Sequence, residues 1–443
     1  LGSERLGVPA AELGTRDGAV YVVAQPSRSV TYGALVQGKR IERTVDGTAP
    51  LQKQSEYTVS GVPTVRLDGA LKVTGKAKYS ADLRIPGLLY AKVVRPPAHG
   101  SMLSSVDTSG AEAMDGVRVV RDGDLVAVLH EAPDLAELAL ADVNARWQEP
   151  TEGVNQDTVY DKLLADVPDA QVVTEAGSLA AGRAGATDVK ETLYRARYVA
   201  HSAMEPHAAV AQVEGERITV WASTQTPFPL QREVARALGW APERVRVITP
   251  FVGGGFGGKT FNLQAVEAAR LAVLAQAPVN VTWSRREEFF YDTFRPATLV
   301  RVSAGLDADK KVAFWDFANM HGGNRSAEPC YHFPHHRVTA AGGWGGQGPR
   351  YHPLAVGAWR APGANVNIWA MEAHMDEMAR AAGMSPVDFR MANLTDERMK
   401  KVLRTAADLF GREVPPAPSG QGYGVALATD AGTFVAAFAE VEV

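Results

Sequence analysis

Cysteine is almost absent from this sequence of 443 residues, since Cys330 is the only one. A single thiol cannot form a disulfide within the chain, and it cannot supply the set of thiolates that an iron–sulfur cluster needs. The longest apolar runs also fall well short of the roughly 20 residues of a membrane-spanning helix. We therefore expect no internal disulfide framework, no iron–sulfur cluster held by this chain alone and no membrane span.

Charge of one sign is not in excess either. The formal net charge is −4, which gives no reason to expect a nucleic acid or an anionic membrane as partner. Glycine, by contrast, is abundant, with 42 residues. Because glycine has no side chain, such a surplus is typical of tight turns and of backbone packed close to a ligand.

Both ends of the sequence look interrupted. The chain begins at Leu1 within a domain-like stretch, and alternate residues from Val435 to Val443 are apolar and share one face. This alternation predicts a strand that is cut short. No signal peptide is visible, which leaves the compartment open between bacterial cytoplasm and periplasm.

The hydrophobic pattern predicts a chain of several regions. A short piece with one strand at 19–24 is followed by a polar linker, and residues 66–150 read as a compact α+β domain. Its expected strands are 78–83, 88–95, 117–120 and 125–129, with a helix over 132–146. In the larger α/β region that follows, strands are expected at 218–222, 245–251 and 279–283, and helices at 230–238, 262–274 and 366–382.

The strongest local feature is the run GGGFGGKT at residues 253–260, between an expected strand and an expected helix. Such a loop offers free backbone N–H groups and a helix N-terminus, and both favour an anionic or oxo-bearing ligand. The spacing Gly253-x4-Gly258-Lys259-Thr260 also fits the nucleotide P-loop. Against a P-loop, the strand 279–283 is followed by serine rather than by an aspartate that could bind a metal ion. On the loop alone, a nucleotide site therefore remains an alternative, and so does a surface turn.

Motifs on both sides of this loop extend the pattern. They are HSAMEPH at 201–207, WASTQ at 221–225 and WRAPG at 359–363. In this order and spacing they resemble the xanthine dehydrogenase / aldehyde oxidase family of molybdenum hydroxylases. KVTGKA at 72–77 and VRPPAHG at 94–100 look like that family's α/β-hammerhead domain.

The resemblance covers most of the chain from about residue 60 onward, and it implies a multidomain α+β and α/β fold of the xanthine oxidase type. Residues 62–155 correspond to the hammerhead, 156–412 to the first molybdopterin-binding domain and 413–443 to the start of a second one. Residues 1–61 resemble the tail of an upstream segment, plus a linker, in isoquinoline 1-oxidoreductase-like large subunits.

The activity that the resemblance implies is hydroxylation of an aromatic N-heterocycle or an aldehyde, with water as oxygen donor. The cofactor would be Mo-molybdopterin, with the cytosine dinucleotide as a candidate form, and the pterin rather than a side chain would hold the metal. Electrons would pass to 2Fe-2S clusters on a small partner subunit, with a cytochrome c as a candidate acceptor. Alternatives from other classes are a P-loop ATPase-like protein and an inactive scaffold.

By resemblance, the cofactor-binding residues are Gln225, Gly255, Phe256, Gly257 and Arg360. The amide of Gln225 would donate a hydrogen bond to an oxo ligand of the metal, and the loop would bring backbone against the cofactor. The family's catalytic base is a glutamate in the C-terminal half, expected beyond Val443. We therefore expect the 443-residue chain alone to be inactive.

Two substrate positions depart from the purine-oxidising members of the family. Thr260 stands where those members carry a glutamate, and Pro362 stands where they carry an aromatic residue. We therefore expect a less polar or bulkier heterocycle, or an aldehyde, in place of a charged purine. Glu205 and His207 are expected to support the cofactor from beneath.

Three other groups invite a metal or charge interpretation. The pair His374-x-x-Glu377 lacks a third ligand and is expected to be a helix-surface pair. The cluster of Cys330 with the histidines at 332, 335 and 336 lacks a second pair at ligand spacing and is expected to be a loop near the substrate funnel. The run RREE at 285–288 is expected to be solvated and self-paired.

Overall fold

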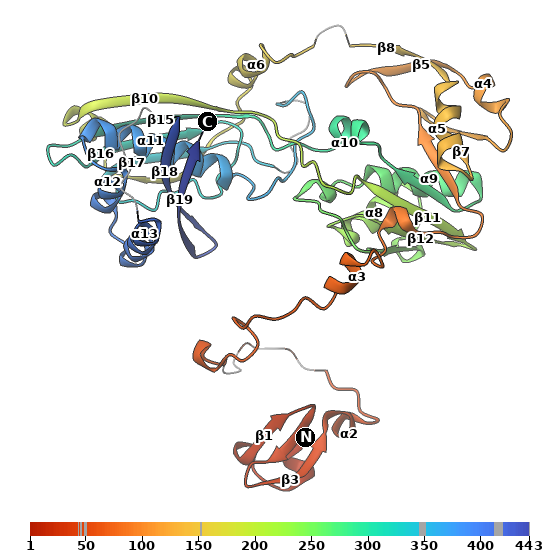
Figure 1. The fold of residues 1–443 in the computed structure, drawn as a ribbon, viewed down its shortest axis with the longest axis horizontal. Helices are drawn as coiled ribbons and strands as arrows, with labels where there is room; N and C mark the ends of the chain where they lie inside the picture. Colours follow the sequence, from red (N-terminus) through yellow and green to blue (C-terminus); the bar gives the residue numbers. More distant parts are fainter. Residues whose placement is uncertain are drawn as a thin grey trace. The chain divides into compact units, whose positions relative to one another are not determined.

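The structure is a computed structural model that describes residues 1–442 except 43, 45–46, 48–50, 151–152, 345–350 and 412–419 (Figure 1). It divides into two units, Leu1–Ala70 and Leu71–Val443. Across the described residues, every helix is too short or too polar to cross a membrane. The expected boundary at 412/413 lies outside the described residues.

The first unit contains a three-stranded antiparallel sheet, of which the sequence predicted only the middle strand. The strands are β1 (Leu13–Arg16), β2 (Ala19–Val22) and β3 (Gln25–Thr31). Asp17 and Gly18 connect the first two, both with positive φ, as a tight hairpin turn requires. The short helices α1 (Gly2–Leu6) and α2 (Tyr32–Val36) flank the sheet.

A seven-stranded sheet forms one half of the second unit. Its order is β13 (Val245–Ile248), β12 (Arg217–Ala222), β11 (Ala208–Glu214), β14 (Val279–Thr282), β4 (Leu89–Val93), β7 (Leu125–His130) and β6 (Arg118–Asp122). The sheet runs across the boundary expected at residue 155, because β4 pairs in parallel with β14. Strands from both expected domains therefore share one hydrogen-bonded layer.

Helices cover both faces of this sheet, because its strands carry apolar residues on both sides. Helices α8 (Pro227–Leu238) and α9 (Leu263–Ala275) pack on the face that carries Ala127 and Leu129. The neighbouring Val128 points to the other face, against α4 (Ser109–Glu112) and α5 (Pro133–Ala141). A separate two-stranded ribbon, β5 (Met102–Asp107) with β8 (Asn144–Gln148), adjoins this region in the chain.

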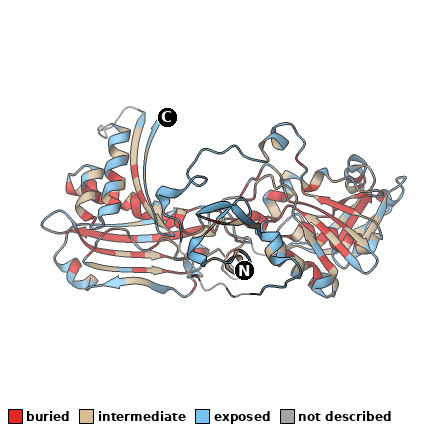
Figure 2. Ribbon diagram, turned by 90° about the horizontal axis from the view of Figure 1, so that it is seen from below, coloured by how far each residue is buried: buried red, intermediate tan, exposed pale blue. Residues whose placement is uncertain are grey.

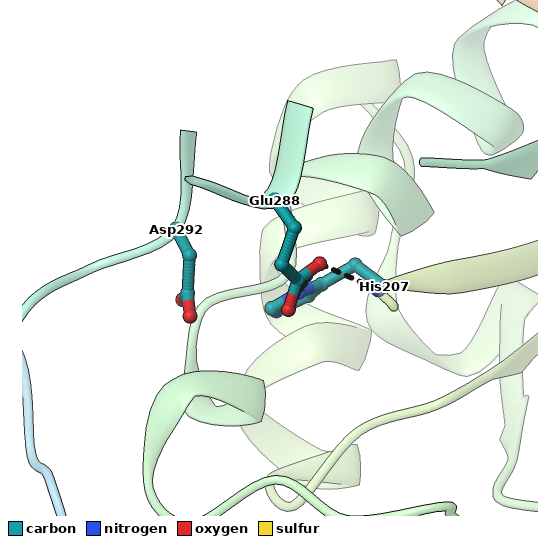
Figure 3. A group of neighbouring side chains, drawn as sticks. All are labelled: His207, Glu288 and Asp292. Carbon is teal, nitrogen blue, oxygen red and sulfur yellow. Dashed lines mark hydrogen bonds and ion pairs between the residues drawn. The ribbon is translucent and has the colours of Figure 1, made fainter. Parts of the chain in front are cut away.

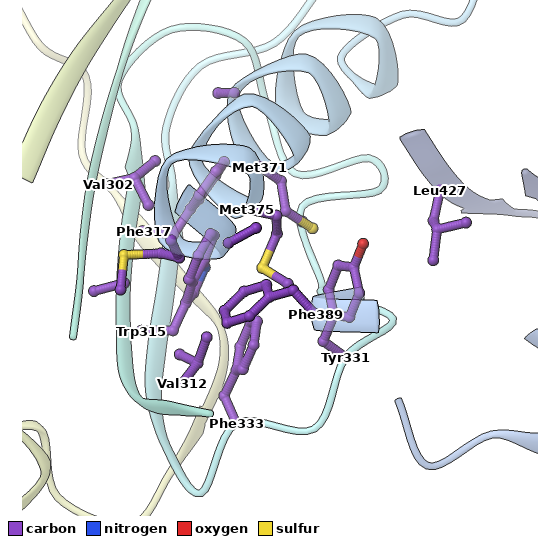
Figure 4. Close-up of a cluster of buried hydrophobic side chains, with 14 of the residues drawn as sticks. Val302, Val312, Trp315, Phe317, Tyr331, Phe333, Met371, Met375, Phe389 and Leu427 are labelled. Carbon is purple, nitrogen blue, oxygen red and sulfur yellow. The ribbon is translucent and has the colours of Figure 1, made fainter. Parts of the chain in front are cut away.

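A five-stranded sheet forms the other half. Its order is β10 (Thr187–Ala196), β15 (Thr298–Leu306), β16 (Val312–Asn319), β17 (His335–Ala340) and β9 (Gln171–Ala176). Helix α11 (Ala364–Ala382) packs over the face that carries Trp315 and Phe317, whereas α7 (Leu179–Ala184) contacts the opposite face. Figure 4 shows this core, and Figure 2 shows buried residues concentrated along the strands of the two sheets.

The C-terminal part of the described chain adds α12 (Pro386–Asn393), α13 (Glu397–Phe410) and the hairpin β18 (Gln421–Asp430) with β19 (Thr433–Glu442). The strand expected near the end of the sequence is present as β19, and the face that carries Val435 and Val441 is turned away from the core. Phe434 and Phe438 pack inward, whereas Val435 and Val441 are 45% and 57% exposed. The phenylalanine rings face the core because they bury more apolar surface than valine side chains would. Phe438 also stacks on Phe410.

Two local predictions were wrong. Residues 78–83 form no strand; they contain a 3₁₀ turn, Ser80–Asp82, and Tyr79 makes one isolated bridge to Phe251. The helix expected over 132–146 ends at Ala141, and β8 follows it. The buried residues of this helix, α5, are Ala136 and Ala139, whereas Leu138 is 58% exposed.

The start of α13 offers a stability test. The carboxylate of Asp396 accepts hydrogen bonds from the backbone N–H groups of Arg398 (2.8 Å) and Met399 (3.0 Å). We expect Asp396→Ala to destabilise this helix by about 1 kcal/mol, because these donors lose their partner. Amide hydrogen exchange in residues 397–403 measures the local opening. Asp396→Asn keeps an acceptor and is the control; equal exchange in Asp396→Ala and the native chain would contradict the capping role.

Candidate cofactor site

Sheet topology brings two of the predicted segments to one edge. Strands β12 and β13 are parallel, with Trp221 opposite Ile248. Gln225 follows the carboxyl end of β12, and residues 253–260, here called the glycine loop, follow β13. Carboxyl ends of adjacent parallel strands lie at the same edge of a sheet, which is where α/β proteins commonly bind ligands.

The glycine loop has a backbone that few other sequences could adopt. Positive φ angles occur at Gly254 (98°), Phe256 (55°) and Gly257 (115°). A Cβ atom added at Gly257 would overlap the carbonyl oxygen of Ala358. The family resemblance attributed this glycine to the approach of a cofactor, whereas the structure supplies a reason within the protein itself.

The side chain of Gln225 is held by the glycine loop. Its Oε1 accepts a hydrogen bond from the Gly257 N–H (3.0 Å), and its own backbone N–H donates to the Lys259 carbonyl (2.7 Å). Gly255 lies so close to this amide that a Cβ there would overlap Oε1. The engaged oxygen leaves the Nε2 donors of the exposed Gln225 without a protein partner in the described chain.

Residues 358–362, here called the arginine segment, meet the loop at its tip. The Arg360 backbone N–H donates to the Phe256 carbonyl (2.8 Å), and the guanidinium carbon lies 4.9 Å from the centre of the Phe256 ring. Thr260 is exposed, and its hydroxyl donates to the Gly257 carbonyl (2.8 Å). Pro362 is half-buried and lines a small hollow with Trp359.

Beneath the loop lies a buried ion pair. Glu205 Oε2 accepts hydrogen bonds from the Gly253 N–H (2.8 Å) and from Lys259 Nζ (2.7 Å), and Lys259 is only 1% exposed. Burial lowers the pKa of Lys259, and the hydrogen bond and charge of Glu205 act against that effect. Because this ammonium is turned inward, it is not available to a nucleotide phosphate. The P-loop alternative is therefore not supported.

Two histidine–carboxylate pairs lie next to this ion pair, and Figure 3 shows the pair of His207 and Glu288 together with Asp292. His207 donates its backbone N–H to Glu288 (2.9 Å), and its Nδ1 also faces that carboxylate. His201 Nδ1 lies 2.7 Å from Asp292 Oδ2. Potential ligand atoms of His207, Glu288 and Asp292 lie within 4.8 Å of one another. The internal partners of His207 and Glu288 account for this group without a metal ion.

The interpretation of residues 285–288 as a solvated run was wrong. Glu288 is 2% exposed and belongs to the buried cluster beneath the glycine loop. Glu287 caps α10 (Arg285–Tyr291) at Ser284 and forms an ion pair with Arg95. Burial raises the pKa of Glu288, but its bonds with His207 and the attraction of that ring outweigh burial, and the net shift is downward. His207 and Arg95 come from distant segments, so no local pattern could have revealed those contacts, whereas the Ser284–Glu287 capping box is a local pattern.

The other metal candidates also lie elsewhere than expected. His374 is fully buried beside Tyr194, not on a helix surface, and burial lowers its pKa to about 4. His335 and His336 belong to β17 instead of a loop. Burial raises the pKa of Cys330 to about 12, which disfavours the thiolate that a metal would need.

The hydrogen-bond donors at this edge fit an anionic, oxygen-rich group. The backbone N–H groups of Gly254, Gly255 and Phe256 have no protein acceptor within the described residues. Further donors are the Nε2 group of Gln225, whose side chain contacts the glycine loop, and the guanidinium of Arg360, which lies over the Phe256 ring of that loop. Phosphate and metal-oxo oxygens accept hydrogen bonds from such donors. The residues present are therefore compatible with a molybdopterin cofactor.

Comparisons with known proteins agree with this chemistry. The family model of the molybdopterin cofactor-binding domain matches residues 164–394, which include Gln225, the glycine loop and the arginine segment. A nicotinate dehydrogenase subunit of Pseudomonas putida is 28% identical over 439 residues, covering 91% of this chain and 36% of that protein. An isoquinoline 1-oxidoreductase subunit of Brevundimonas diminuta is 27% identical, covering 96% of this chain and 62% of that protein.

Solved structures show the same fold. Quinoline 2-oxidoreductase from Pseudomonas putida 86 superposes with a TM-score of 0.69 at 19% identity, covering 83% of this chain and 57% of that chain. The present chain thus spans only part of the length of each of these three relatives. With the family model matching more than half of its residues, the chain belongs to the xanthine-dehydrogenase-type family of molybdopterin cofactor-binding proteins.

Proposed function

We propose that this chain forms the cofactor-binding part of a molybdenum hydroxylase that acts on an aromatic N-heterocycle or an aldehyde. The observation that carries the proposal is the convergence of Gln225, the glycine loop and Arg360 at one edge of the sheet, above the buried ion pair of Glu205 and Lys259. Relatives whose names refer to nicotinate, isoquinoline and aldehydes support this substrate range.

Bound at this edge, the molybdenum cofactor supplies the oxidation of substrate carbon, with oxygen that comes from water. The Nε2 group of Gln225 donates a hydrogen bond to an oxygen at the reacting centre, while Oε1 keeps the amide oriented through Gly257. Arg360 and the free backbone N–H groups of the loop bind the anionic parts of the cofactor. The base that takes the proton is assigned to residues beyond Val443.

Substrate selection belongs to Thr260 and Pro362. The Thr260 hydroxyl already donates to the Gly257 carbonyl, so this position offers no carboxylate to a purine ring. Pro362 offers an apolar ring without a stacking aromatic face. Both features favour a less polar heterocycle or an aldehyde over a charged purine.

Electrons leave to another subunit. A single cysteine, whose burial raises its pKa to about 12, cannot build a cluster. The proposed partner is a small subunit with 2Fe-2S clusters, followed by a cytochrome c as candidate acceptor. The cytosine dinucleotide is the proposed cofactor form. The proposed domains are 1–61, 62–155, 156–412 and 413–443, with the seven-stranded sheet shared by the second and the third.

The test uses the full-length protein, co-expressed with its partner in a host that makes molybdopterin. We expect stoichiometric molybdenum, pterin fluorescence after oxidation, and dye reduction that depends on N-heterocycles or aldehydes. We also expect iron–sulfur absorbance only in the complex and not in this protein alone. A preparation without molybdenum that retains ATP would refute the proposal, and a fully active 443-residue chain would contradict the assignment of the base.

A further inference from the structure

His201 connects the two parts of the site from below. Its side chain is 1% exposed, Nδ1 lies 2.7 Å from Asp292 Oδ2, and Nε2 lies 2.7 Å from the Ala358 carbonyl oxygen. Both neighbours are acceptors, and a neutral imidazole has only one N–H to donate. The geometry is therefore satisfied in full only when the ring is doubly protonated.

The two acceptors belong to different structural segments. Asp292 follows α10, whereas Ala358 begins the arginine segment. The glycine loop lies against both: a Cβ added at Gly258 would come within 2.7 Å of His201 Nδ1 and of Asp292 Oδ2, and one at Gly257 would overlap the Ala358 carbonyl. His201 thus fixes the surface on which the glycine loop rests.

We propose that His201 is a positioning residue that acts as a buried imidazolium, holding the arginine segment against Asp292 and thereby setting the glycine loop in its ligand-binding shape. The effect of this role on cofactor binding rests on the proposed function, since the loop and Arg360 are the proposed cofactor contacts. The docking of the arginine segment against His201 and Asp292 depends only on contacts within this chain.

Charges around His201 favour the cationic ring. The carboxylates of this buried cluster are Glu288 on α10, Asp292 directly after α10 and Glu205 under the loop. Its lysine is Lys259, which all three carboxylates face, and its second imidazole is His207. Three carboxylates face one lysine, so a cationic His201 brings the buried charges toward balance, as burial of charge requires.

The protonation state follows the same balance. Burial alone lowers the pKa of His201, but the hydrogen bond and charge of Asp292, the Ala358 carbonyl and the charge of Glu288 outweigh it, so the net pKa is raised. A raised folded-state pKa contributes stability that is complete below the ordinary value of about 6.5 and is lost as pH rises through the folded value. Docking of the arginine segment should therefore weaken toward alkaline pH.

Hydrogen exchange in the assembled full-length enzyme tests the proposal. Exchange is followed in residues 253–260 and 357–362 across pH, corrected for intrinsic amide chemistry, with molybdenum content measured in parallel. In the native enzyme we expect protection to fall by roughly tenfold as His201 deprotonates, because a bond to a charged group is lost. His201→Ala should lack this protection at every pH.

Asp292→Asn is the matched variant. Its Oδ1 still accepts from the Thr293 N–H, as Asp292 does now at 2.7 Å, and its new Nδ2–H donates to a neutral His201 Nδ1. The neutral ring can then keep its Nε2–H bond to Ala358, so the alkaline step should disappear while docking persists. A purely structural role of His201 would leave no such pH step to remove.

The outcomes separate the two proposals. Protection that is independent of pH in the native enzyme, or an alkaline step that survives in Asp292→Asn, overturns the role of His201. Absence of molybdenum from the native enzyme refutes the proposed function and still leaves the exchange data to decide His201. The pH series on the native enzyme needs no variant, so a His201→Ala protein that fails to fold does not prevent the test.

Discussion

Gly257→Val in the full-length enzyme should lower molybdenum content by at least roughly tenfold. The φ of 115° at this residue costs a β-branched side chain on the order of 1–3 kcal/mol, and its Cβ would overlap backbone of the arginine segment. Relief of this overlap requires a shift of the loop or of residue 358, and such a shift strains the hydrogen bond from the Arg360 N–H to the Phe256 carbonyl. Molybdenum is measured by elemental analysis of the purified complex.

Gly215→Val is the control for backbone strain alone. Gly215 has a φ of 59° in the turn between β11 and β12, and a Cβ there meets nothing within 4 Å. This variant should lose some stability and keep its molybdenum. Equal molybdenum in Gly257→Val and the native enzyme would show that the loop does not depend on its close approach to Ala358.

Gln225→Ala should leave molybdenum in place and reduce turnover by about 10²–10³, the usual cost of losing one well-positioned donor in a transition state. The amide is exposed at the sheet edge, and its Nε2 group has no protein acceptor in the described part of the chain. Its removal is therefore expected to change the chemistry more than the fold. Turnover at saturating substrate, relative to molybdenum content, is the measurement.

Gln225→Glu distinguishes the role of the amide oxygen from the role of the Nε2 donor. Glutamate keeps an oxygen that can accept the Gly257 N–H, so the loop should stay protected from exchange, but it offers no donor at the Nε2 position. We expect its turnover to be as low as that of Gln225→Ala. Near-native turnover in Gln225→Glu would mean that the residue acts only by holding the loop.

Periodic segments of the sequence were predicted well. The helix expected at 366–382 is α11, and the strand expected at 218–222 is β12, because their buried residues recur at the spacing of a helix and of a strand. The ribbon strand β8 was missed because its alternation continues a helical pattern without a clear break. Long-range order, such as β4 beside β14, leaves no mark in either segment.

The candidate site also has parts that the sequence predicted and parts that it could not predict. Motif order indicated that Gln225, the glycine loop and Arg360 belong together, and the structure brings them into contact. Spacing alone could not tell that the side chain of Lys259 turns inward to Glu205. Asp292 carries no local signal, because its role depends on His201, which lies far away in the sequence.

The parallel pairing of Leu89 with Val279 also constrains how this protein is made. During synthesis, β4, β7 and β6 leave the ribosome long before β14 does, so the edge of β4 stays open until most of the glycine-loop region has emerged. Closure of so long a loop is slow, and an open strand edge invites aggregation in the meantime. Aggregation at this edge therefore competes with folding until β14 has emerged and paired with β4.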